Sequence, residues 1–121
     1  TLQLEGVYVY ADKMLEKVFY NLYDNSLRHG QGVTRIRIWF SQSAEGLVIW
    51  YEDDGAGIRD EEKDHIFERG YGENTGFGLF LVREILSLTR ISIRETGVYE
   101  AGARFEIIVP DEIFRLEAKE R

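Results

Sequence analysis

The stretch Asp53-Asp54-Gly55-Ala56-Gly57-Ile58 follows a strongly apolar run, and the interpretation of the whole chain depends on it. Glycines at the end of a strand allow positive φ angles and let a ligand approach the main chain closely. An acidic residue at the same point, Asp53, is a fixed hydrogen-bond acceptor beside the space that the glycines leave. Because an Asp-Gly pair more often closes a hairpin, the stretch alone does not identify a binding site.

Two features on either side of this stretch favour a nucleotide pocket. Upstream, Asn21, Asn25 and Arg28 have i, i+4 and i+7 spacing, so they share one face of a predicted helix. Asparagine is a poor helix former, and its amide oxygen can complete a Mg²⁺ shell made otherwise of water and phosphate oxygens. Downstream, Gly76 and Gly78 open a second helix. The alternative for the first helix alone is a solvated face that carries asparagine by chance.

The bulk composition fits one domain over residues 1–121 and excludes several classes of protein. Hydrophobic residues make up 44% of the chain and charged residues 31%, which is ordinary for a globular protein. A net charge of −7 argues against nonspecific binding to nucleic acid or to anionic membranes. The absence of cysteine fits a reducing compartment, and no apolar run approaches a membrane span. We therefore expect a cytoplasmic, monomeric domain without direct membrane contact. Because the chain opens at Thr1 without methionine, we interpret it as a piece of a longer protein.

The predicted elements indicate an α+β fold, a two-layer α/β sandwich with a mixed, mainly antiparallel sheet and helices on one face. We expect helices at 12–29 (with Asp12 as N-cap), 60–67 and 76–88, a terminal helix or tail at 111–121, and strands at 7–10, 33–41, 47–52, 91–96 and 103–109. The residues that should face the core of the two long helices are Leu15, Val18, Phe19, Leu22 and Ser26, and Leu79, Val82, Ile85 and Leu86.

Four motifs in order resemble those of a known family. The run Asn21–His29 resembles the N box of histidine-kinase catalytic domains, and Asp53–Ile58 resembles their G1 box. Ile66–Tyr71 resembles the F box, and Thr75–Leu79 resembles the G2 box. The resemblance covers residues from about 7 to 109. It implies the ATP-binding fold shared with the gyrase, mismatch-repair and chaperone ATPases, in a domain that belongs to a two-component sensor kinase.

The resemblance also implies roles for the metal and for the base. Asn25 would be the Mg²⁺ ligand, with Asn21 beside it on the phosphate side. Asp53 would accept a hydrogen bond from the exocyclic amine of adenine, where guanine places an acceptor oxygen. His29 matches the position of a ring that packs near adenine, and its alternative is a polar residue at a helix end.

The resemblance implies that two arginines and the glycines of the second helix bind the phosphates. Arg28 and Arg69 are candidates to neutralise phosphate charge, although Arg69 also fits a surface residue of a mobile lid. The complete implied nucleotide-binding set is Asn25, His29, Asp53, Gly55, Gly57, Ile58, Thr75, Gly76, Phe77, Gly78 and Leu79.

The implied activity is phosphoryl transfer from ATP to protein. Related ATPases carry a glutamate where this chain has Asn21, and an amide does not titrate, so we expect slow hydrolysis. The implied acceptor is a histidine on the dimerisation domain of the same kinase, from which a response regulator receives the phosphoryl group. Neither His29 nor His65 has that setting. The alternatives are a serine/threonine kinase of the anti-sigma type, a nucleotide-binding module without transfer, and an α/β domain with accidental glycines.

Two departures from the family pattern concern turns. Only residues 70–75 separate the F and G2 boxes, so the lid is short. The run Leu88-Thr89-Arg90 lacks the glycine pair with which many members turn into the next strand.

Overall fold

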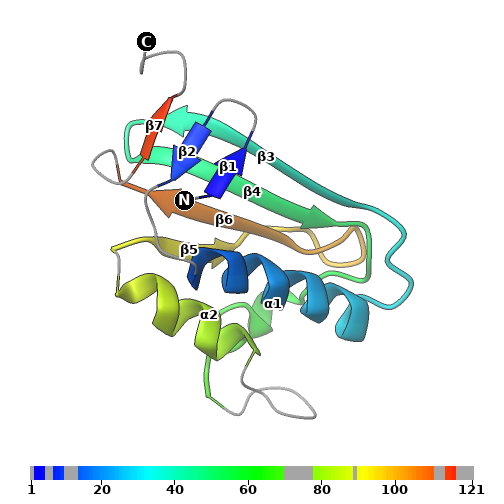
Figure 1. Ribbon diagram of the computed structural model, residues 1–121. Helices are drawn as coiled ribbons and strands as arrows, with labels where there is room; N and C mark the ends of the chain where they lie inside the picture. Colours follow the sequence, from blue (N-terminus) through cyan, green and yellow to red (C-terminus); the bar gives the residue numbers. More distant parts are fainter. Residues whose placement is uncertain are drawn as a thin grey trace.

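A four-stranded antiparallel sheet with two helices on one face forms the body of the chain (Figure 1). The computed structural model describes residues 2–4, 7–9, 14–69, 78–88, 90–110 and 114–116, with side chains for 16–69, 78–88 and 90–110. The helices are α1 (Met14–His29) and α2 (Gly78–Ser87), and the strands, in spatial order, are β3 (Ile36–Ser43), β4 (Gly46–Asp53), β6 (Arg104–Val109) and β5 (Ser92–Glu95). The two-layer α+β architecture is therefore confirmed.

A second, three-stranded sheet joins the two ends of the described chain. It consists of β1 (Leu2–Leu4), β2 (Val7–Val9) and β7 (Phe114–Leu116), in the order β1-β2-β7. The predicted terminal helix or tail at 111–121 is wrong at β7, which pairs antiparallel with β2 through Val7↔Leu116 and Val9↔Phe114. Every strand pair among the described residues is antiparallel, so this part contains no mixed sheet.

The core lies between the four-stranded sheet and the helices, and its residues follow the expected periodicities. Its fully or almost fully buried members are Val18 and Leu22 of α1, Val82 and Leu86 of α2, Leu47, Ile49 and Tyr51 of β4, and Phe105, Ile107 and Val109 of β6. Phe19, Leu79 and Ile85 pack against them as partly buried residues, and Ser26 is buried as predicted. The side chain of Leu15 and the predicted cap Asp12 lie outside the described residues.

Helix α1 ends where the sequence predicts, at His29. Gln31 and Gly32 then take positive φ angles of 54° and 86°, which reverse the chain toward β3. Gly30 is required for a different reason, because a Cβ there would lie 2.2 Å from Val33 Cγ2 and 2.5 Å from the carbonyl oxygen of Ser26. Strand β3 begins later than expected, at Ile36 rather than Val33, and runs to Ser43.

The segment 60–67 is not the short polar helix that its composition suggests. A single 3-10 turn, η1 (Asp60–Glu62), continues as turns to Phe67. Two sets of contacts hold this segment in turns, although its composition favours a helix. Lys63 donates a hydrogen bond to the buried carboxylate of Glu95, and Ile66 and Phe67 are 4% and 6% exposed in the core.

The outer face of the sheet carries an aromatic pair. Trp39 and Trp50 face each other across β3 and β4, with ring centroids 5.8 Å apart and ring planes 7° from parallel. The guanidinium of Arg37 lies 4.8 Å from the Trp39 ring centroid, and that of Arg104 lies 5.3 Å from the Trp50 centroid. These residues alternate with the buried positions of β4, so the pair points away from the helices.

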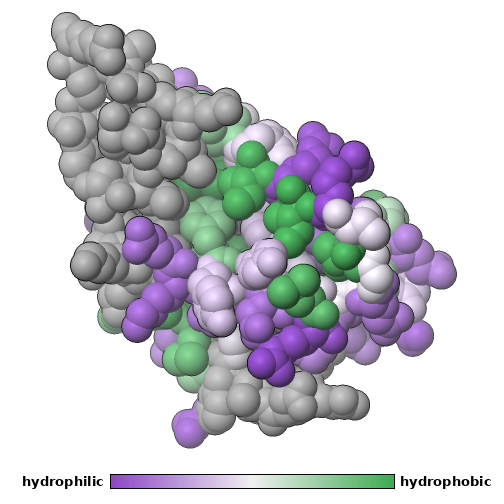
Figure 2. Space-filling model, turned by 45° about the vertical axis from the view of Figure 1, so that its right-hand side comes forward, coloured by the Kyte–Doolittle hydropathy of each residue, from purple (hydrophilic) through white to green (hydrophobic). Residues whose placement is uncertain are grey.

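The described surface also exposes large hydrophobic side chains. Figure 2 shows hydrophobic and hydrophilic side chains interspersed on one face of the molecule. The exposed set includes Tyr20, Tyr23 and Leu27 of α1 and Leu81 of α2. Among the described helices, none is long and apolar enough to cross a membrane.

Candidate nucleotide-binding site

The carboxylate of Asp53 is fixed at the end of β4 by donors from three parts of the chain. Its Oδ1 accepts hydrogen bonds from the backbone N–H of Gly55 and of Ala103, each at 3.0 Å. Its Oδ2 accepts a hydrogen bond from the hydroxyl of Ser26 at 2.7 Å. The residue is only 4% exposed, so these donors replace the water that an ionised carboxylate needs.

The glycines around Asp53 allow three loops to meet backbone to backbone. A Cβ on Gly55 would lie 2.2 Å from the carbonyl oxygen of Gly30, and one on Gly102 would lie 2.0 Å from that of Asp53. Gly57 has a φ of +78°, and its Cβ would crowd the carbonyl oxygens of Val98 and Gly102. The same loops exchange backbone hydrogen bonds, from Ala56 N to the Gly30 oxygen and from Glu100 N to the Ala56 oxygen, both at 2.6 Å. The glycine stretch is therefore needed to build the wall of the site, before any ligand is considered.

Asp54 holds the same loop from the solvent side. Its Oδ1 accepts hydrogen bonds from the backbone N–H of Thr34 at 2.8 Å and of Arg35 at 3.0 Å, and its Oδ2 accepts one from the Thr34 hydroxyl. These donors stabilise the charged form, the Thr34 hydroxyl most, and lower the pKa of Asp54 from 3.8 to about 2. The two adjacent aspartates therefore have different partners, since Asp53 is tied to α1 and Asp54 to the segment before β3.

The last turns of α1 carry the predicted polar face. Asn21 and Asn25 are partly exposed one turn apart, and His29 is exposed at the end of the helix. Arg28 makes an ion pair with Asp24, with its Nε 2.8 Å from Oδ2. Asn21 and Asn25 supply neutral amide oxygens on the helix that also supplies Ser26 to Asp53, so the donor set suits a hard cation beside phosphate.

The remaining predicted residues fall into three groups. Ile58 and Leu79 are partly buried and pack against the core. Gly78 is the first residue of α2, and a Cβ there would meet no heavy atom of the described residues within 4 Å, while Arg69 is exposed. Thr75, Gly76 and Phe77 lie outside the described residues. In the described part, no group of three or more His, Cys, Asp or Glu side chains could hold a metal ion.

Three site residues were missed by the sequence analysis as members of the site: Ser26, Tyr51 and Ala103. Ser26 Oγ lies 2.9 Å from the Tyr51 hydroxyl as well as 2.7 Å from Asp53. The available signal was a polar residue, Ser26, in the apolar stripe of a helix. Ala103 acts through its backbone, which no sequence pattern reveals.

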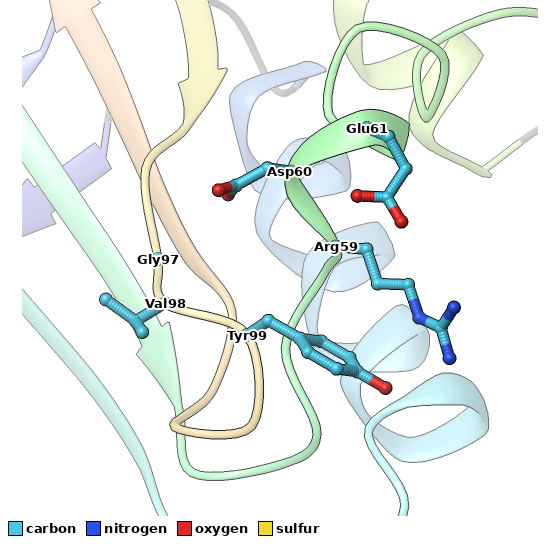
Figure 3. A pocket seen from close by; sticks show the side chains of 6 residues that line it. All are labelled: Arg59, Asp60, Glu61, Gly97, Val98 and Tyr99. Atoms are coloured by element: carbon cyan, nitrogen blue, oxygen red, sulfur yellow. The ribbon is translucent and has the colours of Figure 1, made fainter.

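A hollow is lined by residues that directly follow the glycine loop and by residues that follow β5. The cavity has a volume of about 440 Å³. Figure 3 shows Arg59, Asp60 and Glu61 on one side of it and residues 97–99 on the other. The Arg59 guanidinium lies 5.2 Å from the centroid of the Tyr99 ring. Among the described residues, none of those predicted to bind nucleotide lines this cavity.

A four-stranded antiparallel sheet with helices on one face, and a fixed carboxylate facing the helix that carries the two asparagines, defines an ATPase-type α+β domain. The chain belongs to the histidine kinase-, DNA gyrase B- and HSP90-like ATPase family, whose model matches residues 11–113.

Relatives in sequence come from the histidine-kinase side of this family. The chain is 31% identical over 111 residues to the sensor histidine kinase Hik2 of Thermosynechococcus vestitus, covering 82% of this chain and 28% of Hik2. It is 34% identical over 104 residues to the alginate biosynthesis sensor protein KinB of Pseudomonas aeruginosa, covering 79% of this chain and 17% of KinB. The chain therefore spans less than a third of the length of these relatives. Their names give no support to a serine/threonine kinase of the anti-sigma type.

Solved structures confirm the fold. The ATP-binding domain of PrrB from Mycobacterium tuberculosis matches with a TM-score of 0.66 and 27% identity, over 80% of this chain and 66% of that one. Full-length ShkA, solved in complex with AMPPNP, matches with a TM-score of 0.75 over 84% of this chain and 22% of that one. At 21% identity, the second match bears on the fold alone.

Proposed function

We propose that this chain is the ATP-binding catalytic domain of a longer sensor histidine kinase, which transfers the γ-phosphoryl group of ATP to a histidine on a separate dimerisation domain. The observation that carries the proposal is the carboxylate of Asp53, held by Ser26, Gly55 and Ala103 at the end of β4. Family membership supports the same assignment. A response regulator would then take the phosphoryl group from the histidine, on the cytoplasmic side.

Recognition of the base follows from the acceptor at Asp53. An ionised carboxylate accepts hydrogen bonds and cannot donate them, so it suits the exocyclic amine of adenine and opposes the carbonyl oxygen of guanine. Ile58 adds apolar surface and His29 a ring at the end of α1 beside this position. Gly55 and Gly57 contribute by keeping the loop close to Gly30 and Gly102.

The phosphate end of the site is assigned to α1 and to the start of α2. Asn25 would be the Mg²⁺ ligand, and Mg²⁺ would offset the charge of the phosphates. Asn21 would lie beside the phosphates without activating water. Arg28 and Arg69 would contribute positive charge, and Gly76 and Gly78 backbone N–H groups, together with Thr75, Phe77 and Leu79 at the opening of α2.

The transfer requires an acceptor that another domain brings into line. An imidazole nitrogen of the acceptor forms a bond to the γ-phosphorus, and the bond from that phosphorus to the bridging oxygen breaks, so that ADP leaves with the bonding electrons. The imidazole gives its proton to water. Positioning and charge neutralisation are the contributions of this domain. Neither of its own histidines has the setting of an acceptor, since His65 lies in the turns that follow η1 and His29 ends the N-box helix.

The test is a reconstituted transfer. The isolated chain should bind Mg-ATP without labelling itself, and it should label a separately supplied dimerisation domain in a slow, concentration-dependent reaction. The product should be acid-labile and alkali-stable, as phosphohistidine is. Asp53→Ala should abolish binding and transfer, whereas Asn25→Ala should remove the Mg²⁺-dependent part of the affinity. An acid-stable product on serine, or labelling of His29 or His65, would contradict the proposal.

A further inference from the structure

A chain of two hydroxyl groups leads from the core to the carboxylate of Asp53. Tyr51 is 1% exposed and Ser26 2%, and the Tyr51 hydroxyl lies 2.9 Å from Ser26 Oγ. Ser26 Oγ lies 2.7 Å from Asp53 Oδ2. Among the described residues, no buried side-chain nitrogen or oxygen lacks a hydrogen-bond partner, so this chain is complete.

The direction of these two hydrogen bonds follows from the number of protons that each hydroxyl group can donate. Ser26 has one hydroxyl proton, and it donates that proton to Asp53, which as a carboxylate can only accept. Tyr51 must therefore be the donor to Ser26. Burial raises the pKa of Tyr51 to about 12, so its hydroxyl stays protonated and remains a donor at physiological pH.

Counting acceptors shows what is left for a ligand. A carboxylate offers about four acceptor positions, two on each oxygen. Gly55 N and Ala103 N fill both positions on Oδ1, and Ser26 fills one on Oδ2. One position, on Oδ2, has no donor among the described residues.

We propose that Ser26 and Tyr51 are positioning residues, forming a hydroxyl relay that orients Asp53 so that its Oδ2 accepts a single N–H from the base. The inference rests on the proposed nucleotide-binding function and deepens it. The exocyclic amine of adenine supplies one such donor. Guanine offers two adjacent donors, N1–H and N2–H, which bind side by side to a carboxylate with both oxygens free. Here the backbone N–H groups of Gly55 and Ala103 already occupy Oδ1, so guanine cannot bind both oxygens of Asp53 at once.

The relay is tested by comparing ATP with purine riboside triphosphate, which lacks the exocyclic amine, in calorimetric titrations at fixed Mg²⁺. Ser26→Ala should weaken ATP binding about tenfold, because Asp53 loses a charge-assisted hydrogen bond that fixes its orientation. The affinity for the purine analogue should change by less than about twofold, since it does not use that acceptor. The preference for ATP over the analogue should therefore fall, while GTP should stay a poor ligand because Oδ1 remains filled.

Two further variants separate positioning from packing. Tyr51→Phe should lower the preference for ATP less than Ser26→Ala does, and the double variant should lose no more than Ser26→Ala alone, because both changes interrupt one relay. Ser26→Thr keeps the hydroxyl and should restore the preference. Val18→Ala, a buried change on the same helix that does not touch Asp53, should lower stability and leave the preference unchanged.

The possible results of these titrations contradict different parts of the proposal. Equal losses for ATP and the analogue in Ser26→Ala would make Ser26 and Tyr51 ordinary packing residues and overturn the relay. A gain of GTP binding in that variant would overturn the assignment of Oδ1 as filled. ATP binding that Ser26→Ala leaves unchanged would overturn the relay alone, whereas failure of the unaltered chain to bind ATP would overturn the proposed function and the relay with it.

Discussion

The α-carbon of Gly55 faces the carbonyl group of Gly30 so closely that a Cβ at position 55 would lie 2.2 Å from its oxygen. The same oxygen accepts the hydrogen bond from Ala56 N at 2.6 Å. The end of α1 and the loop after β4 are thus joined through backbone atoms, which cannot move aside as a flexible side chain can. Asp53 lies between these two segments, so its position depends on this contact.

Gly55→Ala should consequently destabilise the fold and displace Asp53. We expect the free energy of unfolding to fall by about 2 kcal/mol or more in denaturant titrations, as overpacking against a rigid neighbour does. Gly78→Ala is the matched control, because in the part of the chain that the structure describes a Cβ there meets no heavy atom within 4 Å. That variant should keep its stability or gain up to about 0.5 kcal/mol, since alanine is the better helix former. Equal effects at the two positions would contradict the close approach.

Lys63 and Glu95 form an ion pair that links the turn after η1 to the strand β5. The Glu95 side chain is 0% exposed, and besides Lys63 it accepts a hydrogen bond from Arg104 N at 3.0 Å. Lys63→Met should cost about 2–4 kcal/mol of unfolding free energy, because it leaves a buried carboxylate without its cation. Adding Glu95→Leu should recover part of the loss, and a double-mutant cycle measures the coupling.

The exposed ion pair between Asp24 and Arg28 is the control for Lys63 and Glu95. Their side chains are 39% and 57% exposed, so solvent screens their attraction. Asp24→Asn should change stability by less than about 0.5 kcal/mol. A loss as large as that of Lys63→Met would mean that burial does not set the strength of these pairs.

Asp54 should make stability depend on acid pH. Its pKa is lowered from 3.8 to about 2 in the folded chain, so folding disfavours its protonation. The stabilisation that Asp54 provides is therefore fully present above about pH 4 and is lost as the pH falls toward 2. In urea titrations across this range, Asp54→Asn should show a shallower fall in stability than the unaltered chain. Thr34→Val removes only the hydroxyl donor and should give an intermediate slope; an unchanged slope in Asp54→Asn would contradict the assignment.

Asn21 should keep the hydrolysis of ATP slow. An amide cannot take a proton from the attacking water, so the steady-state release of phosphate by the unaltered chain should be low. Asn21→Glu introduces a base and should raise the rate about tenfold or more, provided that ATP is saturating. Asn21→Gln is the matched control, with the same length and no titratable group, and it should stay slow. Rapid hydrolysis by the unaltered chain would refute the assignment of Asn21.

Periodicity and glycine placement predicted most of the fold, because they report contacts that each element makes along its own length. The stripe of Val18, Leu22 and Ser26 faces the core as expected, and the glycines after β4 lie where loops meet. The segment 60–67 was predicted wrongly because its composition favours a helix, while the ion pair of Lys63 with Glu95 fixes a turn. The strand β7 depends on pairing with β2 at the other end of the sequence, which no local pattern contains.

For the site too, residues within a short motif could be predicted from the sequence, and partners from distant segments could not. Asp53 and Asn25 were predicted as site residues from motif spacing, because each belongs to a short run of characteristic residues. The partners of Asp53 could not be found in this way, since Ser26, Gly55 and Ala103 reach it from three separate segments.

Arg90 lies in a turn where many members of the family have glycine. It takes a φ of +62° after α2, so a residue with a side chain occupies the left-handed conformation there.

The stacked pair on the outer face of the sheet contains both tryptophans of the chain. Their rings are stacked across β3 and β4, and Trp50 Nε1 donates to Ser41 Oγ at 3.1 Å, so their near-ultraviolet circular dichroism and emission depend on the pairing of these strands. Asp53 and Trp50 have opposite parity along β4, so their side chains lie on opposite faces of the sheet. Tryptophan fluorescence should thus follow unfolding of the hairpin while remaining insensitive to an occupied base pocket. The chain carries an optical reporter of its sheet that is independent of its ligand.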